Sequence, residues 1–119
     1  MKINEIMETL KAHPEAGRIG MIASHLGIVR ATSRNGRDVT EIEVSYDQDE
    51  IEAIIQNTKN LPGIIDVLIE TRDGRLKVGE EIMAVAVAGD IRENVIAVLE
   101  DTLNAIKKSA TKKTEYYEK

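Results

Sequence analysis

Apolar residues near the start of the chain repeat at the spacing of a helix. They fall at positions i, i+3, i+4 and i+7, on one helical face: Ile3, Ile6, Met7 and Leu10. We expect this helix to end at His13, because Pro14 forces the residue before it out of the helical region. Residues 1–16 are therefore predicted to form an N-terminal helical segment.

Two strand patterns follow. Residues 18–30 are apolar, small or β-branched, and predict one long strand or two. A polar turn at 33–38 contains Asn35-Gly36, the strongest hairpin signal in the chain. Residues 39–46 alternate in polarity, so we expect a half-buried strand that pairs back on its predecessor.

The next segments predict a helix and two further strands. Asp47 is a suitable N-cap for a helix over 47–57, and Glu50 occupies the capping-box position. Residues 64–71 and 81–88 are mostly apolar and predict strands.

The last periodic segment predicts a long packed helix from Ile91 to about Lys108. Its apolar positions are Ile91, Val95, Val98, Leu99, Leu103 and Ile106. From Ser109 onward the residues are polar, and we expect a loose tail.

This order of elements predicts an α+β fold, with helices packed on a mostly antiparallel sheet. A chain of 119 residues suits one modest core. We assign residues 17–110 to a single α+β domain and 111–119 to a polar C-terminal tail.

Composition excludes several classes of function. Aromatic residues make up 3% of the chain, which argues against the stacking platforms that bind single-stranded nucleic acid. A net charge of −5 opposes binding to nucleic acid or an anionic membrane. With no cysteine the chain has no disulfide and no sulfur nucleophile, and two histidines form no convincing metal site. We expect no resident cofactor or metal.

The start of the chain lacks the uncharged stretch of a signal peptide, and no apolar run reaches membrane-spanning length. We therefore expect a cytoplasmic protein.

Isolated cations mark the two ends of the last predicted helix. Arg92 lies near its start and Lys107 near its end, an arrangement that suits anion binding. A structural explanation is also open, because lysines at a helix C-terminus complement its dipole and Arg92 could pair with Asp90 or Glu93.

Five segments occur in an order and spacing that match one family. They are 20–30, which ends in Gly-x-Val-Arg; 42–46, a strand that ends in an aromatic; 72–82, similar to Arg-x-Gly-x-Leu-x-x-Gly-Asp/Glu-x-Ile; 85–92, similar to Val-x-Val-x-x-x-His-Arg; and Ile106-Lys107. Together they resemble the MoaE family, the large catalytic subunit of molybdopterin synthase, over about residues 17–113. The resemblance implies a MoaE-like α/β hammerhead fold.

The resemblance also implies an activity. Such enzymes convert a cyclic pyranopterin monophosphate into molybdopterin by installing two dithiolene sulfurs. The sulfur arrives as a C-terminal thiocarboxylate on a small ubiquitin-like partner that ends in Gly-Gly. A chain without cysteine fits this scheme, because it must receive sulfur from elsewhere.

By resemblance, Lys107 is the main catalytic candidate, since its ammonium would stabilise oxyanions and protonate a leaving oxygen. Arg30 and Arg92 would hold the phosphate or pterin through planar, bidentate hydrogen bonds. Arg72, next to a turn, is a further substrate-binding candidate. Lys113 is the candidate for a second catalytic lysine.

This sequence departs from the family pattern at two places. Ile91 stands where the family has His, so one polar substrate contact is missing. Direct register puts Thr114 at the family's second Lys, and Lys113 replaces it if the loop shifts by one residue. An alternative function is therefore a non-catalytic MoaE-like dimeric binding or assembly module.

Other polar residues have structural interpretations. His25 lies in an apolar strand, and a core or interface role is favoured over a metal ligand. Arg34 and Arg37 flank the Asn-Gly turn and are interpreted as solvated hairpin charges.

Helix geometry constrains how a site would be assembled. Arg92 and Lys107 lie roughly 22 Å apart along a straight helix, at about 1.5 Å per residue. One pterin does not readily touch both. We therefore predict a symmetric homodimer in which each site combines Lys107 of one chain with Arg92 of the other.

Overall fold

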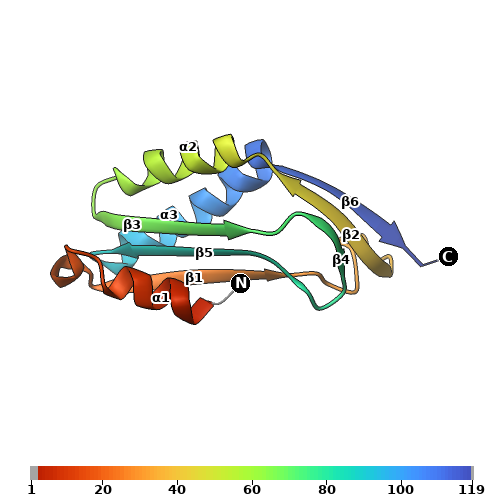
Figure 1. The fold of residues 1–119 in the computed structure, drawn as a ribbon, viewed down its shortest axis with the longest axis horizontal. Helices are drawn as coiled ribbons and strands as arrows, with labels where there is room; N and C mark the ends of the chain where they lie inside the picture. The colour runs from red at the N-terminus through yellow and green to blue at the C-terminus, as the bar shows by residue number, and fades with distance from the viewer. Residues whose placement is uncertain (1–2, 119) are drawn as a thin grey trace.

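The computed structural model describes residues 3–118, which form an elongated molecule of 53 × 25 × 23 Å (Figure 1). Two three-stranded antiparallel sheets follow one another along its length. Three α-helices lie over the first sheet: α1 (Ile3–Lys11), α2 (Gln48–Lys59) and α3 (Arg92–Ala105). A short 3-10 helix, η1 (Ala16–Arg18), follows α1. The expected α+β architecture with antiparallel strands and packed helices is confirmed.

The first sheet has the order β1 (Met21–Ile28), β5 (Glu81–Gly89) and β3 (Ile64–Thr71). Ile6 and Leu10 of α1 pack on one face of the central strand, against its small alanines. Helices α2 and α3 pack on the other face. Because helices cover both faces, β5 is a continuous apolar run and not an alternating one.

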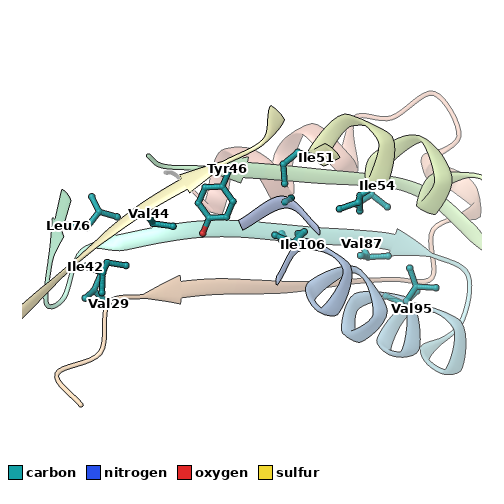
Figure 2. Packing of buried hydrophobic residues seen from close by; sticks show 14 of the residues in the cluster. Val29, Ile42, Val44, Tyr46, Ile51, Ile54, Leu76, Val87, Val95 and Ile106 are labelled. Atoms are coloured by element: carbon teal, nitrogen blue, oxygen red, sulfur yellow. The ribbon is translucent and has the colours of Figure 1, made fainter. Parts of the chain in front are cut away.

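The second sheet has the order β4 (Gly74–Lys77), β2 (Val39–Tyr46) and β6 (Thr111–Tyr117). Its central strand alternates between buried and exposed residues, as the sequence predicted. Ile42, Val44 and Tyr46 point inward and belong to the same buried cluster as side chains of α2 and α3. In Figure 2, Ile42 and Val44 lie beyond the ends of these helices.

The expected pairing of 39–46 with the strand before it is wrong. Strand β2 pairs with β4 and β6, and the β1 edge that it was expected to occupy is taken by β5. Between β1 and β2, the turn at 33–38 is closed by an isolated antiparallel β-bridge between Thr32 and Asp38. The chain leaves the first sheet at Val29, whose N–H donates to the Glu80 carbonyl over 2.9 Å.

The expected loose tail is also wrong. Residues 111–117 form β6, which pairs with β2 in antiparallel register. Two tyrosines fix this strand, because the guanidinium groups of Arg37 and Arg75 lie 3.8 and 4.2 Å from the ring centres of Tyr117 and Tyr116. Strand β4 was not predicted either, since four residues next to a turn carry almost no periodic signal.

The start of α2 and the end of α3 are tied together. The carboxylate of Asp47 caps α2 by accepting from the N–H groups of Asp49 and Glu50, over 3.0 and 3.2 Å. The expected capping box is not completed by Glu50, because the Asp47 N–H donates to the Ala110 carbonyl over 2.8 Å. This bond fixes the segment that carries Lys107.

Among residues 3–118 there is no helix both long and apolar enough to cross a lipid bilayer.

Candidate functional site

A wide turn at the end of α3 positions Lys107. Residues Ile106–Ala110 form π-helix, in which each turn holds more residues than an α-helix does. Ile106 and Ala110 are buried, at 1% and 3% exposure, and anchor both ends of this turn. Thr111 closes it by donating its hydroxyl to the Ile106 carbonyl over 2.9 Å. Lys107 therefore projects from a fixed backbone, and it has no ion-pair partner within the described chain.

Lys107 lines two adjoining open cavities that lie between the two sheets. One has a volume of about 600 Å³ and is mostly polar in its lining residues. The other has a volume of about 500 Å³ and extends over the apolar side chains of the core. Within the described part of the chain, four cationic side chains line the first cavity: Arg30, Arg34, Lys107 and Lys113. The structure thus brings together three of the five candidate residues.

The alternation of side chains along β6 decides which of its residues lines the same cavity as Lys107. Successive side chains of a strand point to opposite faces. Lys113, opposite Val44 of β2, lines both cavities, whereas Lys112 and Thr114 line a different hollow on the other face. Direct register with the family pattern favoured Thr114, but the strand presents Lys113.

Two arginines reach the same cavity from the segment after β1. Arg30 donates its Nε–H to the Thr32 carbonyl over 2.7 Å, which fixes the guanidinium plane. Neither of its terminal nitrogens has a partner among the described residues, so that edge remains available for a bidentate anion contact. Arg34 is exposed, as expected for a turn, but it also lines both cavities.

The second cavity has an apolar wall and a neutral polar group. Its wall is formed by Val44, Ile82, Met83, Leu103 and Ile106. Tyr46 also lines it, and Figure 2 shows the Tyr46 oxygen directed away from β2. Burial, with a smaller contribution from Asp73, raises the pKa of Tyr46 to about 12, so its hydroxyl remains protonated at neutral pH. The neutral Tyr46 hydroxyl can therefore hydrogen-bond a ligand without adding a charge to the cavity.

This arrangement suits a ligand with an anionic part and a flat, partly apolar part. Four cations attract an anion into the first cavity, and among residues 3–118 the one carboxylate that lines it with them is that of Glu115. The Glu115 carboxylate accepts from the Tyr117 hydroxyl over 3.2 Å. The four cations are all exposed, so their attraction for an anion strengthens when a ligand or partner displaces water.

Arg92 and Arg72 do not join this cluster. Arg92 lies at the first turn of α3, with its side chain 77% exposed and its Nη2 3.8 Å from the Glu93 Oε1. Arg72 places its Nη2 3.5 Å from the Glu80 Oε1. Neither arginine lines the cavities that contain Lys107.

The start of α3 is a separate polar corner. The Asp90 carboxylate accepts from the Asn94 amide over 2.9 Å and from the Ile91 N–H over 2.6 Å. These hydrogen bonds, that of Asn94 first, lower the pKa of Asp90 below its usual range. Ile91 and Ile96 are about half exposed, at 52% and 50%, so Arg92 lies in a partly apolar surface.

Sequence reasoning did not predict that His25 and Arg34 line the cavities. Parity along β1 offered a signal for His25, because it lies on the same face as Met21 and Ala23, which are half-buried and pack against the core. Arg34 had no such signal, since its place depends on how the 33–38 turn folds over the second sheet. Within residues 3–118 no three His, Asp or Glu side chains gather into a metal site.

Comparison with known proteins gives one consistent family. The MoaE protein family matches residues 1–109. An uncharacterised protein of Methanocaldococcus jannaschii, MJ0717, is 31% identical over 111 residues, which cover 90% of this chain and 89% of that protein.

Solved structures agree. The molybdopterin cofactor biosynthesis protein E of Burkholderia multivorans superposes with a TM-score of 0.78 at 27% identity, over 99% of this chain and 82% of that one. A chain from the complex of subunits 1 and 2 of the molybdopterin-converting factor of Helicobacter pylori superposes with a TM-score of 0.73 at 17% identity, over 98% and 80%. At 17% identity the likeness shows the fold alone. Since the family match spans most of its length, this chain belongs to the MoaE family.

Proposed function

We propose that this chain is the large subunit of a molybdopterin synthase. It would transfer sulfur from the thiocarboxylated C-terminus of a small ubiquitin-like partner to cyclic pyranopterin monophosphate, and so form the molybdopterin dithiolene. The observation that carries this proposal is the convergence of Lys107, Lys113 and Arg30 on one cavity that adjoins an apolar wall. Two comparisons support the proposal. The chain belongs to the MoaE family, and the relative from Helicobacter pylori was solved in a complex of subunits 1 and 2 of the molybdopterin-converting factor.

Each part of the cavity has a role in this chemistry. The guanidinium of Arg30 would hold the substrate phosphate through its free edge. When the thiocarboxylate sulfur attacks a carbon of the pyranopterin, a C–S bond forms and a C–O bond at that carbon breaks. The ammonium of Lys107 would stabilise the negative charge on the leaving oxygen and protonate it, and Lys113 would add a second positive charge. Water would then hydrolyse the resulting thioester, which leaves the sulfur on the pterin and a carboxylate on the partner. Docking of the small partner over the open cavity would remove water and strengthen these interactions.

The proposal includes a homodimer, because Arg92 does not line the cavity that contains Lys107 of the same chain. Arg92 is 77% exposed, and the exposed side chains of Ile91 and Ile96 lie close to it in sequence. Half-exposed isoleucines beside an arginine suit contact with a second copy. In that dimer Arg92 would reach the cavity of its partner.

Reconstitution tests the activity. The purified chain is mixed with the thiocarboxylated small partner and cyclic pyranopterin monophosphate, and dithiolene product is measured. Product formation that depends on both components is expected. A folded chain that binds both and yields no product would reject the catalytic proposal.

The alternative is a non-catalytic MoaE-like binding or assembly module. Ile91 favours it, because an exposed apolar side chain stands where the family has His. A cell lacking its own large subunit separates the two functions: restored cofactor synthesis supports the enzyme, whereas failure of a well-expressed chain supports the module.

A further inference from the structure

His25 is the polar exception on an apolar face of β1. The side chains of Met21 and Ala23 on that face pack against the core, and His25 follows them with Val85 as its partner on β5. An imidazole in such a place costs free energy unless it finds a hydrogen-bonding partner. Its surroundings therefore decide whether it is structural.

Within residues 3–118, His25 has no hydrogen-bonding or ion-pair partner. The other histidine differs: the Nδ1 of His13 accepts from the Glu15 N–H over 3.0 Å, and its Nε2 lies 3.7 Å from the Asp66 Oδ2. No fully buried side-chain nitrogen or oxygen of the described chain lacks a partner. The unpaired nitrogens of His25 are therefore accessible, and the residue lines both cavities.

Gly27 keeps one of these nitrogens open. It is the next residue on the same face of β1, and a Cβ added there would lie 3.4 Å from the His25 Nε2. That is an ordinary contact distance, so alanine fits without strain but places a methyl group against the nitrogen.

We propose that His25 is a substrate-binding residue that recognises the ring of the ligand, while the nearby cations hold its anionic group. This inference rests on the proposed function, in which the ligand is a pterin carrying a phosphate. His25 lines both the cationic cavity and the apolar one, where the ring of such a ligand would continue from its phosphate. A neutral imidazole both donates and accepts, which matches the ring nitrogens, amino group and carbonyl of a pterin.

The chemistry predicts selectivity between ligands. Inorganic phosphate needs only the cations, namely Arg30, Arg34, Lys107 and Lys113. A pterin phosphate gains the same contacts and one hydrogen bond to His25. In place of the polar contact missing at Ile91, the chain would use an imidazole from β1.

Calorimetric titration of the full chain tests this with two probes: inorganic phosphate and the phosphate monoester of an oxidised pterin. His25→Phe keeps a ring of similar shape and removes the hydrogen bond. We expect it to weaken pterin-phosphate binding about tenfold, the effect of one lost hydrogen bond, and to leave phosphate binding unchanged. His25→Gln, which still hydrogen-bonds, should recover part of the loss. His13→Gln is the matched control and should bind both probes as the unaltered chain does.

Gly27→Ala is the second variant, because it leaves the imidazole in place and covers Nε2. It should weaken pterin-phosphate binding in the same direction as His25→Phe. Equal pterin-phosphate affinity in the unaltered chain, His25→Phe and Gly27→Ala, or no binding of the pterin probe at all, would overturn the role of His25.

Reconstituted turnover separates this inference from the proposed function. Product formation with an unchanged kcat/KM in His25→Phe would reject the inference and retain the function. Binding of the pterin phosphate that depends on His25, with no product from the unaltered chain, would retain the inference and reject the function.

Discussion

The two ends of α3 each carry a cation, but only the C-terminal end, here called the hollow end, adjoins the two cavities that contain Lys107. At the C-terminal end, Lys107 projects from a π-helical turn into a cavity that also contains Arg30, Arg34 and Lys113. At the N-terminal end, Arg92 lies on an open surface, 77% exposed and 3.8 Å from Glu93. The difference arises from the second sheet, because side chains of β2 and β6 line the cavities beside Lys107, whereas Arg92 lines neither of these cavities.

This contrast shows that a cation at a helix end becomes a candidate site only when another element closes over it. Strand β6 provides that closure for Lys107. Nothing in the described part of the chain does so for Arg92, and a second copy would have to.

Lys107→Ala should have the largest effect. Loss of the ammonium that we propose stabilises the oxyanion should lower turnover about 100-fold or more. Lys108→Ala is the matched control, because Lys108 lies outside both cavities, and it should retain activity. Dithiolene formation with the thiocarboxylated partner measures both. Equal activity in the two variants would show that the hollow end of α3 is not the catalytic one.

Arg92→Ala should lower turnover about tenfold or more by removing a substrate contact made across the dimer. A mixture of the Arg92→Ala and Lys107→Ala chains tests directly whether the two residues act in one site. If sites are shared, a mixed dimer has one complete site, so a random mixture should regain about a quarter of full activity. No recovery after subunit exchange, verified by native mass spectrometry, would mean that Arg92 and Lys107 do not cooperate between chains.

Lys113→Ala and Thr114→Ala form a pair that tests strand parity at the hollow end. Lys113 lines the cavity and Thr114 faces the other side of β6. We expect kcat/KM to fall about tenfold for Lys113→Ala and to stay unchanged for Thr114→Ala. The reverse result would assign the second lysine position of the family to residue 114.

Asp90→Asn should have the smallest effect, and it tests the stability of the N-terminal end of α3. Hydrogen bonds from Asn94 and Ile91 hold the pKa of Asp90 below its usual range, so this carboxylate stabilises the fold above the unfolded pKa. That stability is lost as the pH falls through the folded pKa. Thermal unfolding should show a lower Tm for the variant at pH 7 and a difference that vanishes in acid. A constant difference at all pH values would contradict this account.

The strands of the first sheet and the helices that cover it were predictable as separate elements because their signals are local, whereas the pairing of β1 with β5 was not predicted. The apolar run of β5 and the periodic faces of α1 and α3 follow directly from burial on both sides of a sheet. Asp47 was recognised as an N-cap because its carboxylate acts within one turn.

The second sheet was not predictable in the same way. Strand β6 is rich in polar residues, and its pairing with β2 joins segments about 70 residues apart in the chain. Charged side chains are typical of edge strands, so they conceal a strand among loop-like residues. The sequence identified Lys107 but not Arg34, whose position depends on how the 33–38 turn folds over the second sheet. His25 was also missed, although its place on β1 carried a local signal.

The five-residue π-helical turn from Ile106 to Ala110 has a consequence for how the chain tolerates insertions and deletions. Its length sets the phase in which β6 begins, and a shift of one position turns every side chain of a strand to the opposite face. If the pairing of β6 is otherwise kept, removal of one residue there would place a neighbour at the position of Lys113 and turn the Lys113 side chain to the face opposite the cavity. The spacing between Lys107 and Lys113 is therefore as constrained as their identities.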